Sequence, residues 1–235
     1  WYYKNTGTSA SPSYEYQSND VLQRTMVDLG AETAPIFLDY DGNGVQDLLI
    51  STNRNTQKGG SFLVLFENKG TNSQPIYKRK ETDYLSLKQD NYAALRPAAG
   101  DLNGDGATDL VIGNSGGRLQ YYENQSGPGE AINLQLVTEQ LDSIDVGRGA
   151  APAIGDVNSD GQQDLIVGSS FRDLYYFRQT SGGSNLAFKE VTDGLGGINK
   201  EKFSYLTPRL ADLDQNGNLD LLLGTRRKGF FLYQD

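Results

Sequence analysis

Short apolar runs of three or four residues, separated by stretches rich in glycine, asparagine and aspartate, recur along this chain. Four of these runs each follow an acidic segment: Leu48-Leu49-Ile50, Leu110-Val111-Ile112, Leu165-Ile166-Val167 and Leu221-Leu222-Leu223. Aromatic segments come shortly after each run, and aromatic side chains favour strands. No segment shows the periodicity of a long amphipathic helix. The pattern therefore predicts an all-β protein with many turns.

A repeating unit of four strands explains this spacing. It is clearest over residues 96–138, where the pattern predicts a first strand at 96–100, a second at 109–113, a third at 119–124 and an outer fourth at 132–138. A proline opens every first strand, where its missing amide harms a ladder least: Pro35, Pro97, Pro152 and Pro208. The acidic segments begin 62, 55 and 56 residues apart. Antiparallel four-stranded units repeated in this way are typical of β-propeller blades.

The count of third strands exceeds the count of acidic segments by one. Aromatic third strands are expected near residues 1–7, 65–70, 120–125, 174–178 and 230–235. Their aromatic side chains are expected to pack between blades: Tyr121, Tyr122, Tyr175, Tyr176, Phe230 and Phe231. We therefore predict part of a preceding blade at 1–30, full blades at 31–95, 96–148 and 149–205, and a last, incomplete blade at 206–235.

The segment before each apolar run has the spacing of a calcium-binding loop. From Asp101 to Asp109, oxygen-bearing side chains stand at positions 1, 3, 5 and 9, and Gly106 stands at position 6, where such a loop turns through positive φ. Calcium takes about six to eight oxygen ligands, and position 7 of such a loop adds its backbone carbonyl. Position 12 holds Ile112 instead of the glutamate of an EF-hand, so Asp109 must close the shell.

The same positions recur in all four loops. The predicted metal ligands are Asp39, Asp41, Asn43, Val45 and Asp47; Asp101, Asn103, Asp105, Ala107 and Asp109; Asp156, Asn158, Asp160, Gln162 and Asp164; and Asp212, Asp214, Asn216, Asn218 and Asp220. Aspartate, asparagine and glycine also build ordinary solvated turns, which is the alternative interpretation. Four loops with the same ligand and glycine positions favour Ca²⁺, in up to four sites.

Missing residue types and the charge narrow the possible chemistry. The chain has no cysteine and no histidine, which excludes disulfides, thiolate sites, histidine-ligated zinc and histidine-dependent nucleophiles. The formal net charge is −9, but the loops hold twelve of the 30 acidic residues, and four Ca²⁺ ions would bring the charge to −1. No basic stripe indicates nucleic acid, and no apolar run approaches a membrane span. The chain begins at Trp1 without methionine, which fits a removed signal peptide.

These units resemble FG-GAP repeats, also called VCBS repeats, of integrin α-subunit propellers and many secreted bacterial proteins. Residues 101–110 fit the family's calcium pattern, whereas Ser159 and Gln215 replace the glycine at position 4 of their loops. The resemblance implies a ring of about six to eight blades, of which this chain would be a fragment. A closed small propeller is the alternative. The resemblance also implies an extracellular or cell-surface location in a larger, secreted or surface protein, bacterial by the character of its third strands.

A second set of residues points to a partner. In a blade, the turn between strands 2 and 3 and the connection from strand 4 to the next strand 1 lie opposite the acidic loop. The turns are basic, and the predicted ligand-binding residues are Arg54, Arg118, Arg172, Arg226, Arg227 and Lys228. Such a surface can hold an acidic glycan or an acidic protein segment by charge-assisted hydrogen bonds and stacking. Solvated basic turns are the alternative.

Two classes of function fit these features. The first is a non-enzymatic binding or adhesion module stiffened by calcium. The second is a polysaccharide-active enzyme or its accessory propeller domain, which would need two free carboxylates facing a cleft. Most aspartates belong to the loops and the glutamates show no obvious pairing, so the sequence favours the binding module and no enzymatic activity.

Overall fold

A computed structural model describes residues 2–8, 11–18, 29–30, 32–52, 60–90, 92–171, 173–191 and 204–234. The chain divides into two compact units, Trp1–Gly30 and Ala31–Asp235.

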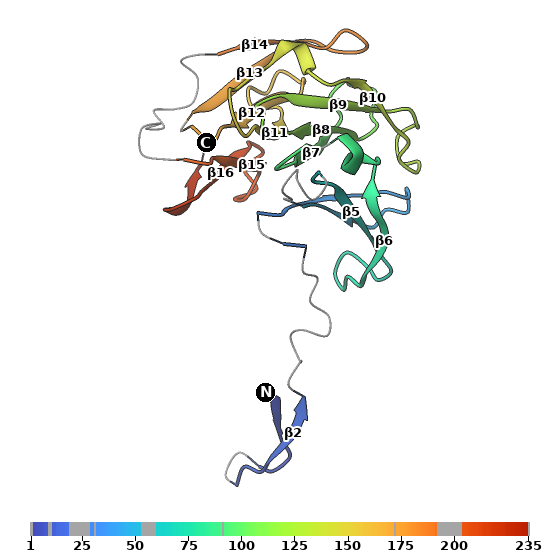
Figure 1. Cartoon of the computed structure of the whole chain (residues 1–235), viewed down its shortest axis with the longest axis vertical. Coiled ribbons are helices and arrows are strands. Elements are labelled where there is room, and N and C mark those ends of the chain that lie inside the picture. Colours follow the sequence, from blue (N-terminus) through green and yellow to red (C-terminus); the bar gives the residue numbers. More distant parts are fainter. Residues whose placement is uncertain are drawn as a thin grey trace. The chain divides into compact units, whose positions relative to one another are not determined.

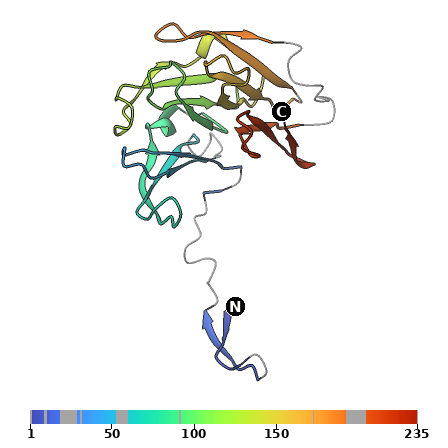
Figure 2. The same cartoon turned by 180° about the vertical axis from the view of Figure 1, so that it is seen from behind.

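Four antiparallel sheets, each built from consecutive strands, form the larger unit (Figure 1; Figure 2 shows the opposite side). Their strands are β3 (Ala34–Leu38), β4 (Asp47–Ser51), β5 (Leu63–Asn68) and β6 (Tyr77–Tyr84); β7 (Arg96–Gly100), β8 (Asp109–Gly113), β9 (Leu119–Asn124) and β10 (Leu134–Thr138); β11 (Ala151–Gly155), β12 (Asp164–Gly168), β13 (Leu174–Ser181) and β14 (Ala187–Glu190); and β15 (Thr207–Ala211), β16 (Asp220–Thr225) and β17 (Gly229–Tyr233). Short 3-10 helices η2 (Leu87–Asp90) and η3 (Leu141–Ser143) follow the first two sheets. The sheets are the four blades of a β-propeller, which confirms the predicted all-β fold. Membership of a larger ring stays a prediction.

The first two strands of each blade pair in one register. The proline is the second residue of the first strand and lies opposite an apolar residue of the second: Pro35 and Ile50, Pro97 and Ile112, Pro152 and Val167, Pro208 and Leu223. The aspartate at position 9 of each loop begins the second strand and pairs with the residue just before the loop, as Asp109 pairs with Gly100. The bounds of β7, β8 and β9 agree with the predicted strands, whereas the outer strand β10 begins two residues later than predicted.

The hydrophobic core lies between neighbouring blades. Each of three clusters joins side chains of one blade to side chains of the next: Leu49 and Leu65 with Leu110 and Ile112; Val111 and Leu119 with Leu165 and Val167; Ile166 and Leu174 with Leu221 and Leu223. Burial of each such aliphatic side chain contributes about 1.5–3 kcal/mol. Stability therefore depends on the stacking of blades as much as on each sheet.

Glycines permit this close stacking. A Cβ on Gly113 would lie 2.2 Å from the carbonyl oxygen of Ala150, and one on Gly168 would lie 2.2 Å from the carbonyl oxygen of Leu206. Both glycines end a second strand and touch the chain entering the next blade's first strand. Backbone contact at this distance leaves no room for a side chain.

One packing expectation fails for the last blade. The aromatic residues Tyr121, Tyr122 and Tyr176 are buried, as inter-blade packing predicts, but Phe230 is 71% exposed. Among the described residues, β17 pairs only with β16, so the last blade has three strands, and no described blade covers the side chain of Phe230.

The smaller unit is a hairpin of β1 (Tyr2–Asn5) and β2 (Tyr14–Ser18). Its turn repeats a feature of the blades. The Asn5 Oδ1 atom accepts the N–H groups of Gly7 and Ser13 at 3.0 and 3.1 Å, just as the Oδ1 atom of Asn68, at the end of β5, accepts two N–H groups of the turn into β6. The two turns share this hydrogen-bond pattern, as expected if residues 1–30 carry strands 3 and 4 of a preceding blade. That assignment stays a prediction.

Candidate metal centres and the opposite loop face

The position-9 aspartates hold each loop to its blade. Asp109 is 1% exposed. Its Oδ2 atom accepts the N–H of Leu102 at 3.1 Å and the hydroxyl of Tyr121 at 3.0 Å, and its Oδ1 atom accepts the N–H of Asn124 at 2.9 Å. One carboxylate therefore joins the start of the loop, the second strand and the end of the third strand. Sequence reasoning assigned Asp109 to a metal and missed this bracing role.

The other three aspartates at position 9 are bound in the same way. All are at most 1% exposed, and each accepts an N–H group of its own loop or of the end of the third strand: Asp47 from Tyr40 and Asn68, Asp164 from Gln179, Asp220 from Leu213. The Tyr176 hydroxyl donates to Asp164 as Tyr121 does to Asp109. Burial raises the pKa of Asp47, Asp109 and Asp164, opposed by these hydrogen bonds.

The aspartates at position 1 curl the loops. Asp101 accepts N–H groups of Gly104, Asp105 and Gly106 at 2.8–3.1 Å. The corresponding Asp39, Asp156 and Asp212 each accept two N–H groups from positions 5 and 6 of their loops. The position-6 glycines have φ between 81° and 95°, as expected for a sharp turn. Position 4 is also left-handed, including the non-glycine residues Ser159 (58°) and Gln215 (62°).

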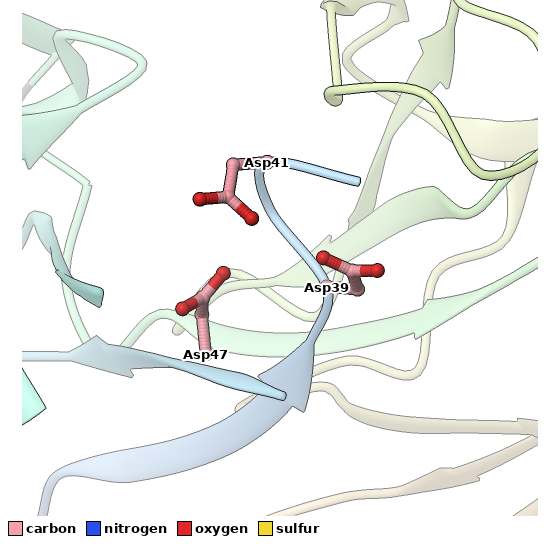
Figure 3. Close-up of side chains that lie close together, drawn as sticks. All are labelled: Asp39, Asp41 and Asp47. Atoms are coloured by element: carbon pink, nitrogen blue, oxygen red, sulfur yellow. The ribbon is translucent and has the colours of Figure 1, made fainter. Parts of the chain in front are cut away.

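Carboxylates converge in two of the four loops. Oxygen atoms of Asp39, Asp41 and Asp47 lie within 4.8 Å of one another (Figure 3), as do those of Asp212, Asp214 and Asp220. Both loops have aspartate at position 3. The second and third loops have asparagine there, and their extra carboxylates stand at position 5, where Asp105 accepts the N–H of Ala107 and Asp160 that of Gln162.

The first loop contains a buried oxygen that lacks a partner. The Oδ1 atom of Asp41 is inaccessible to solvent and has no hydrogen-bond partner among the described residues. Figure 3 shows the carboxylates of Asp41 and Asp47 directed toward each other. A bound cation would satisfy this oxygen and offset the repulsion of the three charges. The donor set, carboxylate and carbonyl oxygen only, fits a hard cation such as calcium.

The predicted basic residues differ in their surroundings. Arg54 and Arg172 lie outside the described residues. Arg118 pairs with Asp145 at 3.8 Å, an acidic partner that sequence reasoning missed. Arg226 lies over the ring of Tyr205, 4.6 Å from its centroid. Arg227 and Lys228 are exposed in the turn between β16 and β17.

The 2–3 turns and the 4–1 connections meet around a cavity. We call these turns and connections together the loop face. Two adjoining lobes of about 520 and 420 Å³ open there, at the start of the inner strands β3, β7, β11 and β15, and form what we call the inner-strand cavity. Turn residues Ser115 and Ser170 line it together with connection residues Ala94 and Gly149. Two arginines of inner strands, Arg96 and Arg209, also line it; the sequence offered no signal for Arg209.

The acidic loops mark the start of a repeat that this chain shares with known proteins. The FG-GAP-like repeat matches residues 39–112, 101–167 and 156–223, together more than three quarters of the chain. This chain belongs to the FG-GAP-like repeat family. Each match begins at the position-1 aspartate of one loop and ends within the second strand of the next blade. The repeat thus comprises an acidic loop, the rest of its blade and the following loop and strand.

Integrin α chains are among the relatives of this FG-GAP-like chain. Integrin alpha-3 of Cricetulus griseus is 30% identical over 73% of this chain and 17% of its own length. Integrin alpha pat-2 of Caenorhabditis elegans is 25% identical over 93% of this chain and 19% of its own length. The chain thus spans less than a fifth of these relatives. Among solved structures, one of a Photorhabdus luminescens Tc holotoxin pore matches 99% of this chain and 12% of its own, at 15% identity and a TM-score of 0.35. No helix in the described part of the chain is long and apolar enough to cross a membrane.

Proposed function

We propose that this chain is a non-enzymatic, calcium-stabilised extracellular binding module that acts in adhesion at a cell surface. Similarity to integrin α chains and the FG-GAP-like repeats support the binding role and the extracellular location. The observation that carries the calcium part is the convergence of three carboxylates in the first loop with one buried oxygen that lacks a partner. The whole protein to which the chain belongs is proposed to be a larger secreted or surface protein.

The proposed ligands are the side chains at positions 1, 3, 5 and 9 and the carbonyl at position 7 of each loop. The hydrogen bonds from backbone N–H groups curl each loop before any ion is present, so little ordering is needed on binding. The first and fourth loops, with aspartate at position 3, are expected to bind calcium more tightly than the second and third, because more negative charge converges there.

Calcium binding is tested by thermal melting and calorimetry on chelated protein. Calcium in about hundredfold excess over Kd should add about 2.7 kcal/mol of stability per site, and elemental analysis should find bound metal. Asp41→Asn should weaken binding at the first loop. Asp145→Asn, on the opposite face, is the control and should leave calcium binding unchanged. Melting that is indifferent to calcium, with no metal in the protein, would refute this part of the proposal.

The loop face is the proposed partner site, for an acidic glycan or an acidic protein segment. Support comes from Arg227 and Lys228, exposed in their turn, and from the Arg226–Tyr205 pair, on a chain whose net charge is −9. Exposed charges are screened over about 8 Å at physiological salt, so binding should weaken as salt is raised.

Immobilised polygalacturonate and polyaspartate are suitable probes of this face. The double change Arg227→Ser with Lys228→Ser should weaken binding without lowering the melting temperature in calcium. Its matched control is Lys78→Ser with Lys189→Ser, which removes two exposed lysines from the outer strands β6 and β14. If both double variants bind alike, or if neither polymer binds the unaltered chain, the loop face is not the site of an acidic partner.

A further inference from the structure

The inner-strand cavity concentrates positive charge in an acidic protein. Arg96, Arg148, Arg209 and Arg226 line its two lobes, and the one carboxylate in their described lining belongs to Glu32. The volumes, about 520 and 420 Å³, fall in the range of small-molecule sites, roughly 300–1,000 Å³. Of these four arginines only Arg226 belongs to the predicted basic turns, so those turns do not account for most of this charge.

Two of the arginines are withdrawn from solvent and have few counter-charges. The Arg96 side chain is 17% exposed; its Nη1 atom donates to the carbonyl of Leu95 at 3.1 Å, and its Nη2 atom lies 3.9 Å from Glu32 Oε2. Arg209 donates from Nη1 to the carbonyls of Pro208 at 3.0 Å and Pro152 at 3.4 Å. No described carboxylate forms an ion pair with Arg209. Burial lowers the pKa of both, and the charge of Arg96 lowers that of Arg209 further.

Such an arrangement is costly without an anion. A buried charge that is only partly paired destabilises the fold, and guanidinium groups bind carboxylates by bidentate hydrogen bonds. The positions equivalent to Arg209 in the second and third blades are Ala98 and Ala153. The first blade has the larger Ile36 at this position. The two alanines leave space beside the side chain of Arg209, where a third cavity of about 420 Å³ is lined by Ile36, Ala98, Ala153 and Arg209 among others.

The rim of the cavity adds aromatic and hydroxyl groups. Phe171 and Tyr205 are 61% and 42% exposed, with Arg148 and Arg226 over their rings at 5.5 and 4.6 Å. Ser115, Ser170 and Thr207 supply hydroxyl groups to the lining. Aromatic faces suit the apolar face of a sugar ring, and hydroxyl groups suit its oxygens.

The backbone places side chains at this rim at an energetic cost. Two residues before each inner strand, the chain adopts a left-handed conformation: Glu32 (φ 56°), Ala94 (53°), Gly149 (67°) and Tyr205 (55°). Only the third blade uses glycine, and there a Cβ would lie 2.1 Å from the Ser170 hydroxyl. Left-handed non-glycine residues are strained and cluster at functional sites, so their presence at three of four positions supports a binding role for the rim.

We propose that the inner-strand cavity binds a hexuronate, a sugar carrying a carboxylate, with the carboxylate held by Arg96 and Arg209 and the ring against the rim aromatics. This inference rests on the proposed function and names the ligand class of its loop face. A sugar acid is favoured over an acidic peptide because hydroxyl and aromatic groups line the cavity beside the guanidinium groups.

Calorimetric titration of the calcium-loaded chain with galacturonate and digalacturonate tests this proposal. Both should bind, and neutral galactose should bind at least about tenfold more weakly, because charge-assisted hydrogen bonds are lost. Arg209→Gln and Arg96→Gln should each weaken galacturonate binding at least about tenfold. Arg178→Gln removes an exposed arginine of β13, outside the cavity lining and the loop face, and is the matched control, expected to bind like the unaltered chain.

A second readout separates binding from misfolding. Arg209→Met replaces a half-buried, unpaired charge with an apolar side chain of similar length, so it should keep or raise the melting temperature while galacturonate binding is lost. The proposal is overturned if galactose binds as well as galacturonate, if no sugar acid binds, or if the Arg209 variants bind normally. Tighter binding of a Glu-Glu dipeptide than of digalacturonate would overturn the sugar assignment.

Changes at Arg209 and changes at Arg227 with Lys228 distinguish the cavity from the exposed turn as the binding site. Polygalacturonate binding that is lost on changing Arg227 and Lys228 but kept on changing Arg209 would leave the loop face as the partner site and reject the cavity. If polygalacturonate binding is lost on changing Arg209 but kept on changing Arg227 and Lys228, the cavity is the binding site and the exposed turn is not.

Discussion

Asp109→Ala tests whether the position-9 carboxylate braces its blade independently of any ion. The alanine leaves three donors without their acceptor: the N–H groups of Leu102 and Asn124 and the hydroxyl of Tyr121. Leaving a buried donor unsatisfied costs about 1–3 kcal/mol, and partial access of water to a relaxed loop reduces the sum to roughly 3–6 kcal/mol. For a chain of this size, that is a fall in melting temperature of roughly 6–24 °C.

The assay is thermal and urea unfolding with excess chelator, so that metal binding contributes nothing. Asn103→Ala is the matched control in the same loop, because Asn103 is partly exposed. Its oxygen accepts one backbone N–H group, that of Asp105, and its amide donates to the carboxylates of Asp105 and Glu123, which water can solvate when the amide is removed. This change should cost less than about 1 kcal/mol. If Asp109→Ala is as mild as the control in chelator and differs only in calcium, the carboxylate is a metal ligand without a bracing role, and the reasoning fails.

Three further changes address the loop and the blade contacts. Asn103→Asp removes an amide donor and adds a charge, so it should lower the melting temperature in chelator and tighten calcium binding measured by calorimetry; unchanged affinity would contradict this. Gly113→Ala places a Cβ 2.2 Å from the carbonyl oxygen of Ala150 and should destabilise by at least about 2 kcal/mol in urea unfolding. Tyr121→Phe removes one buried donor to Asp109 and should cost about 1–2 kcal/mol, less than Asp109→Ala in the same experiment.

Much of this fold was readable from local patterns. The strands β7, β8 and β9 could be placed because a proline, an acidic loop and an apolar run recur in a fixed order, and each feature acts within about a dozen residues. The curl of the loops also follows from local chemistry, since Asp101 bonds to N–H groups three to five residues away.

The candidate sites were readable only in part. The ligand spacing predicted the acidic loops, but aspartate at position 3 rather than 5 decides where three carboxylates converge, as in the loop of Asp41. The prediction of basic turns did not include Asp145, which lies 27 residues after Arg118 in the chain and pairs with it. The exposed Phe230 was expected to be packed, because residue type alone does not tell whether a neighbouring blade covers it.

The sequence by itself determined the repeat, the strand order and the acidic loops, because hydrogen bonds and apolar spacing within one unit specify them. Only the tertiary structure decided which side chains of different blades meet. Arg96 and Arg209 are 113 residues apart in the chain and share one cavity because both lie on inner strands. No local pattern marks Arg209, since residues of the three other blades, among them Ile36, Ala98 and Ala153, make its environment.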